Sequence, residues 1–260
     1  MEGCMLFRRC IYFTTMLLAV CGFSKSEVDL HKFDTVKAKY SKLLADEYNE
    51  ILHGFLSMCG VSLTEWKAHV QSCLPNYEKE EAHDAQAIKN NGSKPLRPNT
   101  IALVKKMLEQ AKINRPVHIL SNQQTGNDAY ARRSIVVINE QKCDTECPKQ
   151  AYFEAMMSHE MQHLIFEDTF VGFCISELYK KHGQRVKNVQ AWNALLHRFE
   201  HFYERRADIL GALAKPEYVA VRREAFNYLM TWFDLSEDKD HPSMQSRYAQ
   251  MVQIEREIQK

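Results

Sequence analysis

The chain has 260 residues, of which 45% are hydrophobic, and its 34 Lys and Arg residues nearly balance 33 Asp and Glu residues, so the formal net charge is +1. This balance gives no electrostatic reason to expect a nucleic acid or an anionic membrane surface as a partner. The length and the hydrophobic share predict a globular protein of one domain, or of one domain with a small appendage.

Residues 1–24 are typical of a targeting segment. Arg8 and Arg9 precede an apolar run from Ile11 to Phe23, which fits a secretory signal peptide in its length and flanks. Two alternatives stay open, an uncleaved N-terminal anchor and lipidation at Cys21. We therefore expect an exported protein, periplasmic or secreted, or one attached to a membrane through its N-terminus only. No later hydrophobic run is long enough to span a bilayer.

Five of the eight cysteines lie after this segment. If the chain is exported, the natural local disulfides are Cys59–Cys73 and Cys143–Cys147, and Cys174 stays free in an apolar stretch. The alternative is that all five are reduced thiols. A metal site at Cys143 and Cys147 is disfavoured, because no second Cys or His pair accompanies them at zinc-finger spacing.

Residues 25–97 are expected to form a helical N-terminal region with a linker. Apolar residues recur at helical spacing over 27–58, which predicts an amphipathic helix that packs on the main body or binds a partner. Ser62 and Glu65 form a capping-box pattern that predicts a second helix ending near Cys73. The polar residues 76–98 read as a linker or an exposed loop.

In residues 98–260, sequence signals for helices and strands follow one another closely. They predict a single α+β domain with more helix than strand. A helix is expected from Asn99 to about Ile113, strands at 116–120 and 134–139, a turn between them, and a loop at 140–148. A helix should then run from about Lys149 to Glu167. Four more helices are expected at about 170–182, 188–213, 217–233 and 243–258.

The helix at 149–167 contains the pattern His159-Glu160-Met161-Gln162-His163. Histidines at positions i and i+4 project from one face of a helix toward one point. Two neutral imidazoles there supply two ligands of a tetrahedral zinc, and Glu160 can activate a water molecule in an open coordination position.

A third protein ligand must come from a later helix, because no Gly or third His follows His163 at the close spacing of the metzincins. The best choice is Glu204. Asp208, one turn further on, could accept a hydrogen bond from the outer nitrogen of a ligating histidine, and Ala207 would let two helices approach closely. Two alternatives for the third ligand stay open, His201 and Glu177.

Three motifs in this order resemble those of the gluzincin peptidases that include HtpX and the CAAX prenyl endopeptidase, chiefly their soluble, periplasmic members. They are His159-Glu160-x-x-His163, Glu204-x-x-Ala207-Asp208 and His241-Pro242-x-x-x-x-Arg247, and the resemblance covers roughly residues 98–250. Two departures, Gln162 in place of a frequent Gly and a compact spacing between His163 and Glu204, bear on the shape of the pocket more than on the metal.

The resemblance implies a zincin-like metallopeptidase fold, with a small sheet beside the active-site helix, and one zinc ion per chain. It makes His241 the group that stabilises the oxyanion and Arg247 a residue that orients a carboxylate of the site or the substrate. His241 could instead be a helix-start residue before Pro242. The resemblance also makes His159, His163 and Glu204 the zinc ligands and Glu160 the general base.

The segment that contains Asn127, Ala129 and Tyr130 is similar to the edge-strand region of that family, with an Asp inserted. An extended protein or peptide substrate would add to this edge through main-chain hydrogen bonds. The expected function is zinc-dependent endopeptidase activity on unfolded or partly folded proteins. The alternative is a zincin-like chaperone or assembly factor whose zinc site is latent or plugged.

Overall fold

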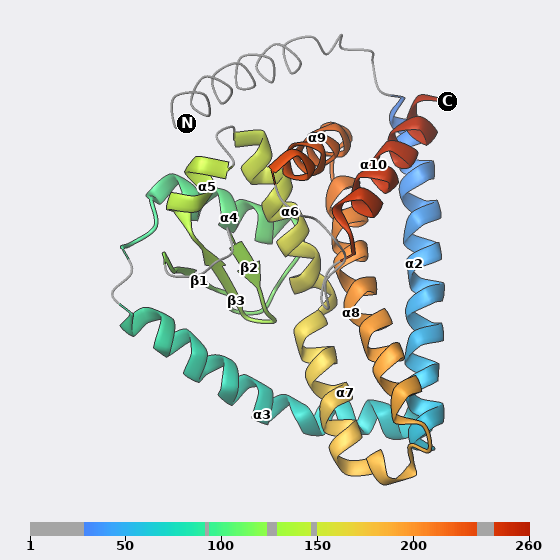
Figure 1. The fold of residues 1–260 in the computed structure, drawn as a ribbon. Helices are drawn as coiled ribbons and strands as arrows, with labels where there is room; N and C mark the ends of the chain where they lie inside the picture. Colours follow the sequence, from blue (N-terminus) through green and yellow to red (C-terminus); the bar gives the residue numbers. More distant parts are fainter. Residues whose placement is uncertain (1–28, 92–93, 124–128, 147–149, 233–241) are drawn as a thin grey trace, which may run out of the picture.

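The computed structural model describes residues 29–91, 94–123, 129–146, 150–232 and 242–260. The predicted targeting segment, Asn127, Cys147 and His241 lie outside these residues. The described part is mostly helical with one small sheet (Figure 1), so the predicted α+β class with helix in excess is confirmed.

The two N-terminal helices begin at side-chain caps. In α2 (Leu30–Cys59), the carboxylate of Asp29 accepts hydrogen bonds from the first backbone N–H groups, and the helix ends at Gly60 with a φ of 61°. In α3 (Leu63–Asn90), Ser62 and Glu65 form the predicted capping box. Both caps satisfy N–H groups that lack partners within the helix, which fixes where each helix starts.

The predicted end of the second helix near Cys73, with a linker after it, is wrong. The helix continues through Pro75 to Asn90, because residues at intervals of about four along it are buried. Glu81 accepts hydrogen bonds from the backbone N–H and the hydroxyl of Ser134 at the start of a strand. Ala85 and Ile88 pack beneath the sheet. Tertiary contacts therefore hold a polar sequence in a helix.

The sheet has three strands in the order β1-β3-β2. The central strand β3 (Ile135–Ile138) is wholly buried and pairs in parallel with β1 (His118–Ser121) and antiparallel with β2 (Ala129–Ala131). Alternate residues of β3 serve opposite faces. Ile135 and Val137 face α3, whereas Val136 and Ile138 share a cluster with residues of α4 (Pro98–Gln110) and α6 (Gln150–Phe166).

The remaining helices follow the predicted pattern with one exception. α5 (Glu140–Glu146) occupies most of the stretch predicted as a loop, so that prediction is wrong; its first turn is tied to the start of α4 by the ion pair between Glu140 and Arg97. The helices predicted after it are observed as α6, α7 (Asp168–His182), α8 (Val189–Ala212), α9 (Pro216–Trp232) and α10 (Met244–Gln259).

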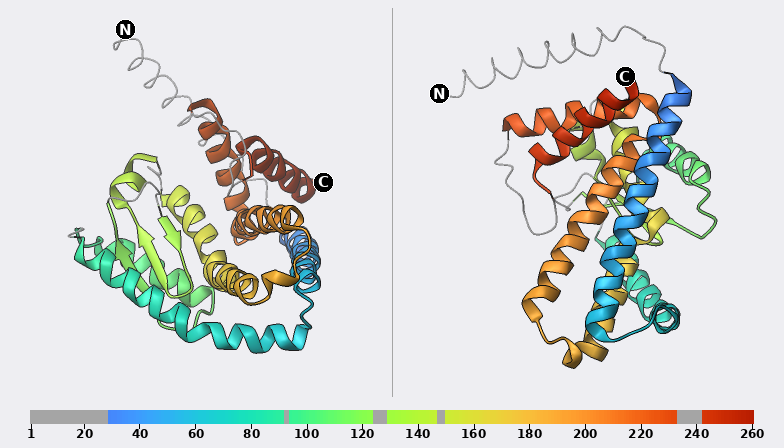
Figure 2. Two further views of the ribbon diagram at one scale, coloured as in Figure 1. Left: turned by 60° about the horizontal axis from the view of Figure 1, so that its bottom comes forward. Right: turned by 90° about the vertical axis from the view of Figure 1, so that its right-hand side faces the viewer.

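The largest hydrophobic core lies among helices. α2 runs beside α8 (Figure 2), and residues of α2, α3, α7, α8, α9 and α10 share one buried cluster. Phe55 packs edge-on against Trp192 and Phe199 at its centre. The N-terminal helices therefore belong to the same core as the C-terminal ones. Among the described helices, none has the length and apolar character needed to cross a bilayer.

Candidate metal centre

The His-Glu-x-x-His pattern lies on α6, which is held between the sheet and α8 (Figure 1). His159, Glu160 and His163 are all buried. The Nε2 atoms of the two histidines are 3.1 Å apart, so both rings direct the same nitrogen to one point, as the spacing of four on a helix predicts.

Glu204 of α8 completes the group. One carboxylate oxygen is 3.4 Å from Nε2 of His159, and the other is 3.5 Å from Nε2 of His163. Burial alone would raise the pKa of Glu204, but its contacts with the two histidines outweigh burial and lower that pKa to about 2. The group is therefore two imidazoles and one carboxylate, and these three residues could hold a metal ion.

The two alternative ligands do not join this group. Glu177 pairs with Lys180 one turn along α7, and the ring of His201 lies against that of His197, with 4.0 Å between the ring centres. Only His159, His163 and Glu204 have donor atoms that all lie within 4.8 Å of one another, in the part of the chain that the structure describes.

The outer nitrogen of His159 contacts a buried charge cluster. Nδ1 is 2.9 Å from Oδ1 of Asp208 on α8. Arg247 of α10 binds the two oxygens of this carboxylate at 2.5 and 2.8 Å, and Arg222 of α9 pairs with it too. Burial alone would raise the pKa of Asp208, but the charges of Arg247 and Arg222 outweigh it and hold that pKa well below its usual value. Asp208 is therefore an ionised carboxylate placed to accept a hydrogen bond from Nδ1–H of His159, which would leave the Nε2 lone pair free for a metal. The same nitrogen also lies 2.9 Å from the guanidinium of Arg222.

The outer nitrogen of His163 contacts a second carboxylate, which sequence reasoning missed. Nδ1 is 2.9 Å from Oδ2 of Asp168, the first residue of α7, and Asp168 pairs in turn with Arg206 of α8. The guanidinium of Arg206 lies 3.9 Å from the ring centre of Phe166. An acidic residue five positions after His163 was the signal in the sequence; Arg206 and Arg222 had no such signal.

The pKa of His163 reflects the negative charge that surrounds its imidazole. Burial alone would lower it, but the hydrogen bond with Asp168 and the charges of Glu204 and Glu160 raise it to about 9. The buried site therefore attracts positive charge, either a proton on His163 or a cation among the three donors.

Glu160 lies on the same helix, between the two histidines in sequence, and is buried with them. Burial raises its pKa, while the charges of His159, His163 and Arg222 oppose the shift. A carboxyl group with a raised pKa accepts a proton more readily than an ordinary one, which suits it to act as a general base.

Close contact between α6 and α8 sets the distance between the ligands. The hydroxyl of Ser158 donates a hydrogen bond of 2.9 Å to the carbonyl of Gly211. A Cβ atom at Gly211 would lie 2.9 Å from the backbone nitrogen of His159, so the helices can approach this closely only at a glycine. Ala207, fully buried one turn earlier, extends the narrow face that the sequence predicts.

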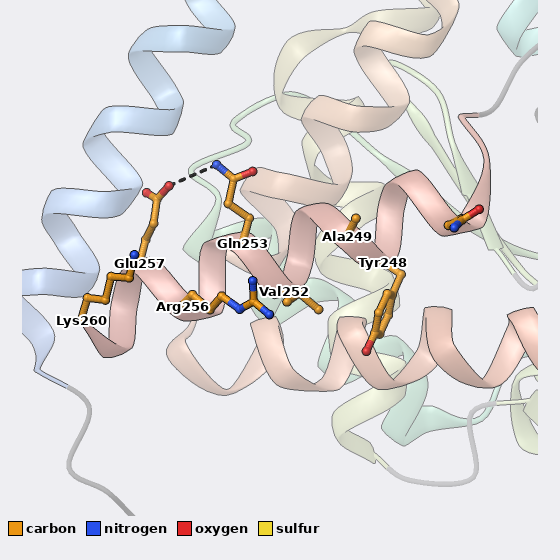
Figure 3. A pocket seen from close by; sticks show the side chains of 8 residues that line it. Tyr248, Ala249, Val252, Gln253, Arg256, Glu257 and Lys260 are labelled. Carbon is orange, nitrogen blue, oxygen red and sulfur yellow. Dashed lines mark hydrogen bonds between the residues drawn. The ribbon is translucent and has the colours of Figure 1, made fainter.

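The other predicted site residues fall at different places. Arg247 binds Asp208, one of the two roles foreseen for it. Ala129 and Tyr130 lie on β2, beside α6 and at the edge of the described sheet, with Ala129 buried and Tyr130 half-buried. A surface hollow lies elsewhere, along α10 (Figure 3), and none of the predicted site residues lines it.

The predicted Cys59–Cys73 disulfide is wrong for this structure. Both residues are free and buried, because Cys59 ends α2 inside the helical core while the sulfur of Cys73 lies 3.4 Å from Nε2 of His69 on the side of α3 that packs against α7. Cys143 is buried, and its predicted partner Cys147 lies outside the described residues, so this second pairing stays a prediction.

Comparison of the chain with known protein families, with curated proteins and with solved structures finds no match. Function is therefore inferred from the geometry of the site and from the chemistry of its residues.

Proposed function

We propose that this protein is a zinc-dependent endopeptidase of zincin-like fold, similar to the HtpX and CAAX prenyl endopeptidase group. The observation that carries the proposal is the convergence of His159, His163 and Glu204 on one point, with Glu160 on the same helix. Two imidazoles and one carboxylate are a donor set that zinc favours, and three protein ligands leave a coordination position open.

The donor set fits a metal in a second respect. Each histidine has its outer nitrogen 2.9 Å from a carboxylate, Asp208 for His159 and Asp168 for His163. Such carboxylates fix the tautomer that directs the Nε2 lone pair to the metal. When bound, zinc supplies a Lewis acid that polarises a carbonyl group and lowers the pKa of water.

The residues of the chain supply the remaining chemistry. Glu160 accepts a proton from the attacking water and passes it to the leaving amine, which its raised pKa favours. Asp208, held by Arg222 and Arg247, keeps His159 in place. His241 is proposed to stabilise the oxyanion, on the resemblance alone. An extended substrate would pair with the β2 edge near Ala129 and Tyr130.

The substrate class proposed is an unfolded or partly folded protein, and the N-terminal segment favours an exported or membrane-attached location. A second candidate is a chaperone or assembly factor with a latent zinc site. The low exposure of the site favours this alternative, since His159 and His163 are each 7% exposed and Glu160 is 8% exposed. A substrate would have to reach a site that is nearly closed.

One assay separates the two candidates. The purified full chain is loaded with zinc and incubated with an unfolded protein such as reduced casein, with and without a chelator. We expect cleavage that the chelator abolishes. Glu160→Gln should keep its zinc and lose about 10²–10⁴-fold in turnover. Glu154→Gln is the matched control, because Glu154 is on the same helix but pairs with Lys215 and Tyr218.

Full activity in Glu160→Gln would remove Glu160 from the mechanism. Zinc bound at one ion per chain with no cleavage by the wild type would select the chaperone. Zinc content unchanged in Glu204→Ala would overturn the assignment of the third ligand.

A further inference from the structure

A second group of reactive side chains lies where α3 crosses α7 (Figure 1). The hydroxyls of Tyr77 on α3 and Thr169 on α7 are 2.7 Å apart, and the Tyr77 ring packs on those of Phe170 and Phe173. These contacts hold the two helices in a defined register at this point.

Two thiols meet in this crossing. The side chains of Cys73 on α3 and Cys174 on α7 interact at this crossing, and both residues are buried in the same hydrophobic cluster. His69, one turn before Cys73, has its Nε2 atom 3.4 Å from the sulfur of Cys73 and 2.9 Å from the carbonyl oxygen of Cys174. The imidazole therefore contacts both cysteines and fixes their relative positions.

We propose that Cys73 and Cys174 form a disulfide that ties α3 to α7 when the protein meets an oxidised thiol compound. The pair joins positions about 100 residues apart in the sequence, which no local spacing would suggest. A disulfide requires two cysteines whose side chains can meet across packed elements. At this crossing His69 contacts both the sulfur of Cys73 and the carbonyl oxygen of Cys174, which brings the two residues close together.

The reaction is thiol–disulfide exchange. The Cys73 thiolate attacks one sulfur of oxidised glutathione, forms a mixed disulfide and releases one glutathione thiolate. The Cys174 thiolate then attacks the Cys73 sulfur and releases the second glutathione. The protein loses two protons and two electrons, and oxidised glutathione gains them as two thiols.

Cys73 is the first thiol to react, because it lies on the wall of a surface hollow that also includes His69, Ser72 and Asn76. Cys174 has no exposed surface and is the resolving thiol. Burial raises the pKa of both thiols, so few thiolates exist at neutral pH and the exchange should be slow.

The test uses the full chain, incubated with oxidised glutathione, alkylated and digested with trypsin without reduction. The sequence places Cys73 in the peptide 68–79 and Cys174 in the peptide 150–180. We expect mass spectrometry to find these two peptides joined, and a reductant to separate them. Cys59→Ser, a matched change at another buried cysteine, should keep the joined species.

Cys174→Ser should instead carry glutathione on Cys73. The oxidised wild type should melt about 10 °C above the reduced protein, because a loop of about 100 residues is closed. Cys59→Ser should show the same rise and Cys174→Ser should not. Cys73 joined to Cys59, or glutathione adducts on both Cys73 and Cys174 with no joined peptides, would overturn the proposal; both results come from the wild-type chain and do not depend on how the variants fold.

Discussion

On each side of the metal group a carboxylate contacts the outer nitrogen of a histidine, but the two carboxylates are brought there in different ways. On one side, His159 contacts Asp208, which α8 supplies and which arginines of α9 and α10 hold. On the other side, His163 contacts Asp168, only five residues further along the chain, and one arginine of α8 holds it. The first side is assembled by tertiary packing of three helices, and the second by a turn between two consecutive helices.

The two sides also differ in buried charge. Asp208 neutralises one of two buried guanidinium groups, Arg222 and Arg247, whereas Asp168 faces Arg206 alone. Arg206 has a further partner in the ring of Phe166. A buried charge without a partner is costly, so the His159 side should depend more strongly on its carboxylate than the His163 side does.

The largest effect is expected from Asp208→Asn. The change keeps the shape of the side chain but leaves two buried guanidinium groups without a carboxylate, so the free energy of unfolding should fall by about 3–5 kcal/mol. Urea unfolding of the metal-free protein measures it. Asp144→Asn is the control, because Asp144 pairs with Arg97 on the surface and its loss should cost at most about 1 kcal/mol. Equal losses in the two variants would contradict the comparison.

A smaller effect is expected from Asp168→Asn. Arg206 loses its charge partner but keeps its contact with Phe166, and His163 can give up its proton once Asp168 no longer favours the charged form, so the free energy of unfolding should fall by about 2–3 kcal/mol. Zinc affinity should also fall by about 10–100-fold, because His163 loses the carboxylate that orients its ring. Competition with a zinc chelator measures this. An affinity equal to that of the wild type would show that Asp168 has no part in the metal site.

The smallest effect is expected from Gly211→Ala, which pushes α8 away from the backbone of His159. The added methyl group would clash with backbone atoms that cannot move aside, and the free energy of unfolding should fall by about 1–2 kcal/mol. Gly172→Ala on α7 is the matched control. A Cβ atom there meets only Phe199 at 3.8 Å, so this change should be neutral or stabilise the helix by about 0.5–1 kcal/mol. The same outcome for both glycines would show that the approach of α6 to α8 is not tight.

Sequence patterns predicted the parts of the site that depend on helical geometry. Histidines four residues apart must share a helix face, and Glu204 with Asp208 repeats that spacing, so these four residues could be paired before their helices were placed. The run of β-branched residues at 135–138 likewise predicted β3. Each of these inferences needed contacts only within one element.

Hydrophobic periodicity did not predict the structure of segments that are buried by contacts with another helix or strand. The stretch after Pro75 looks polar, and Glu81 within it is charged, yet the sheet buries it and uses its carboxylate to bind Ser134. Cys73 gave an equally misleading local signal, since it is not joined to Cys59 but packs with His69 against Cys174 of α7.

By itself, the sequence determined which residues can act as ligands and base, and that the ligand pairs lie on helices, because the spacing of a helix is a local property of the backbone. Only the tertiary structure decided which buried arginines pair with the carboxylates that contact the histidines. Arg222 and Arg247 reach Asp208 through the packing of α8, α9 and α10, and Arg206 reaches Asp168 through the packing of α7 on α8. Such contacts join residues separated by many positions in the sequence, so a local periodic pattern cannot predict them.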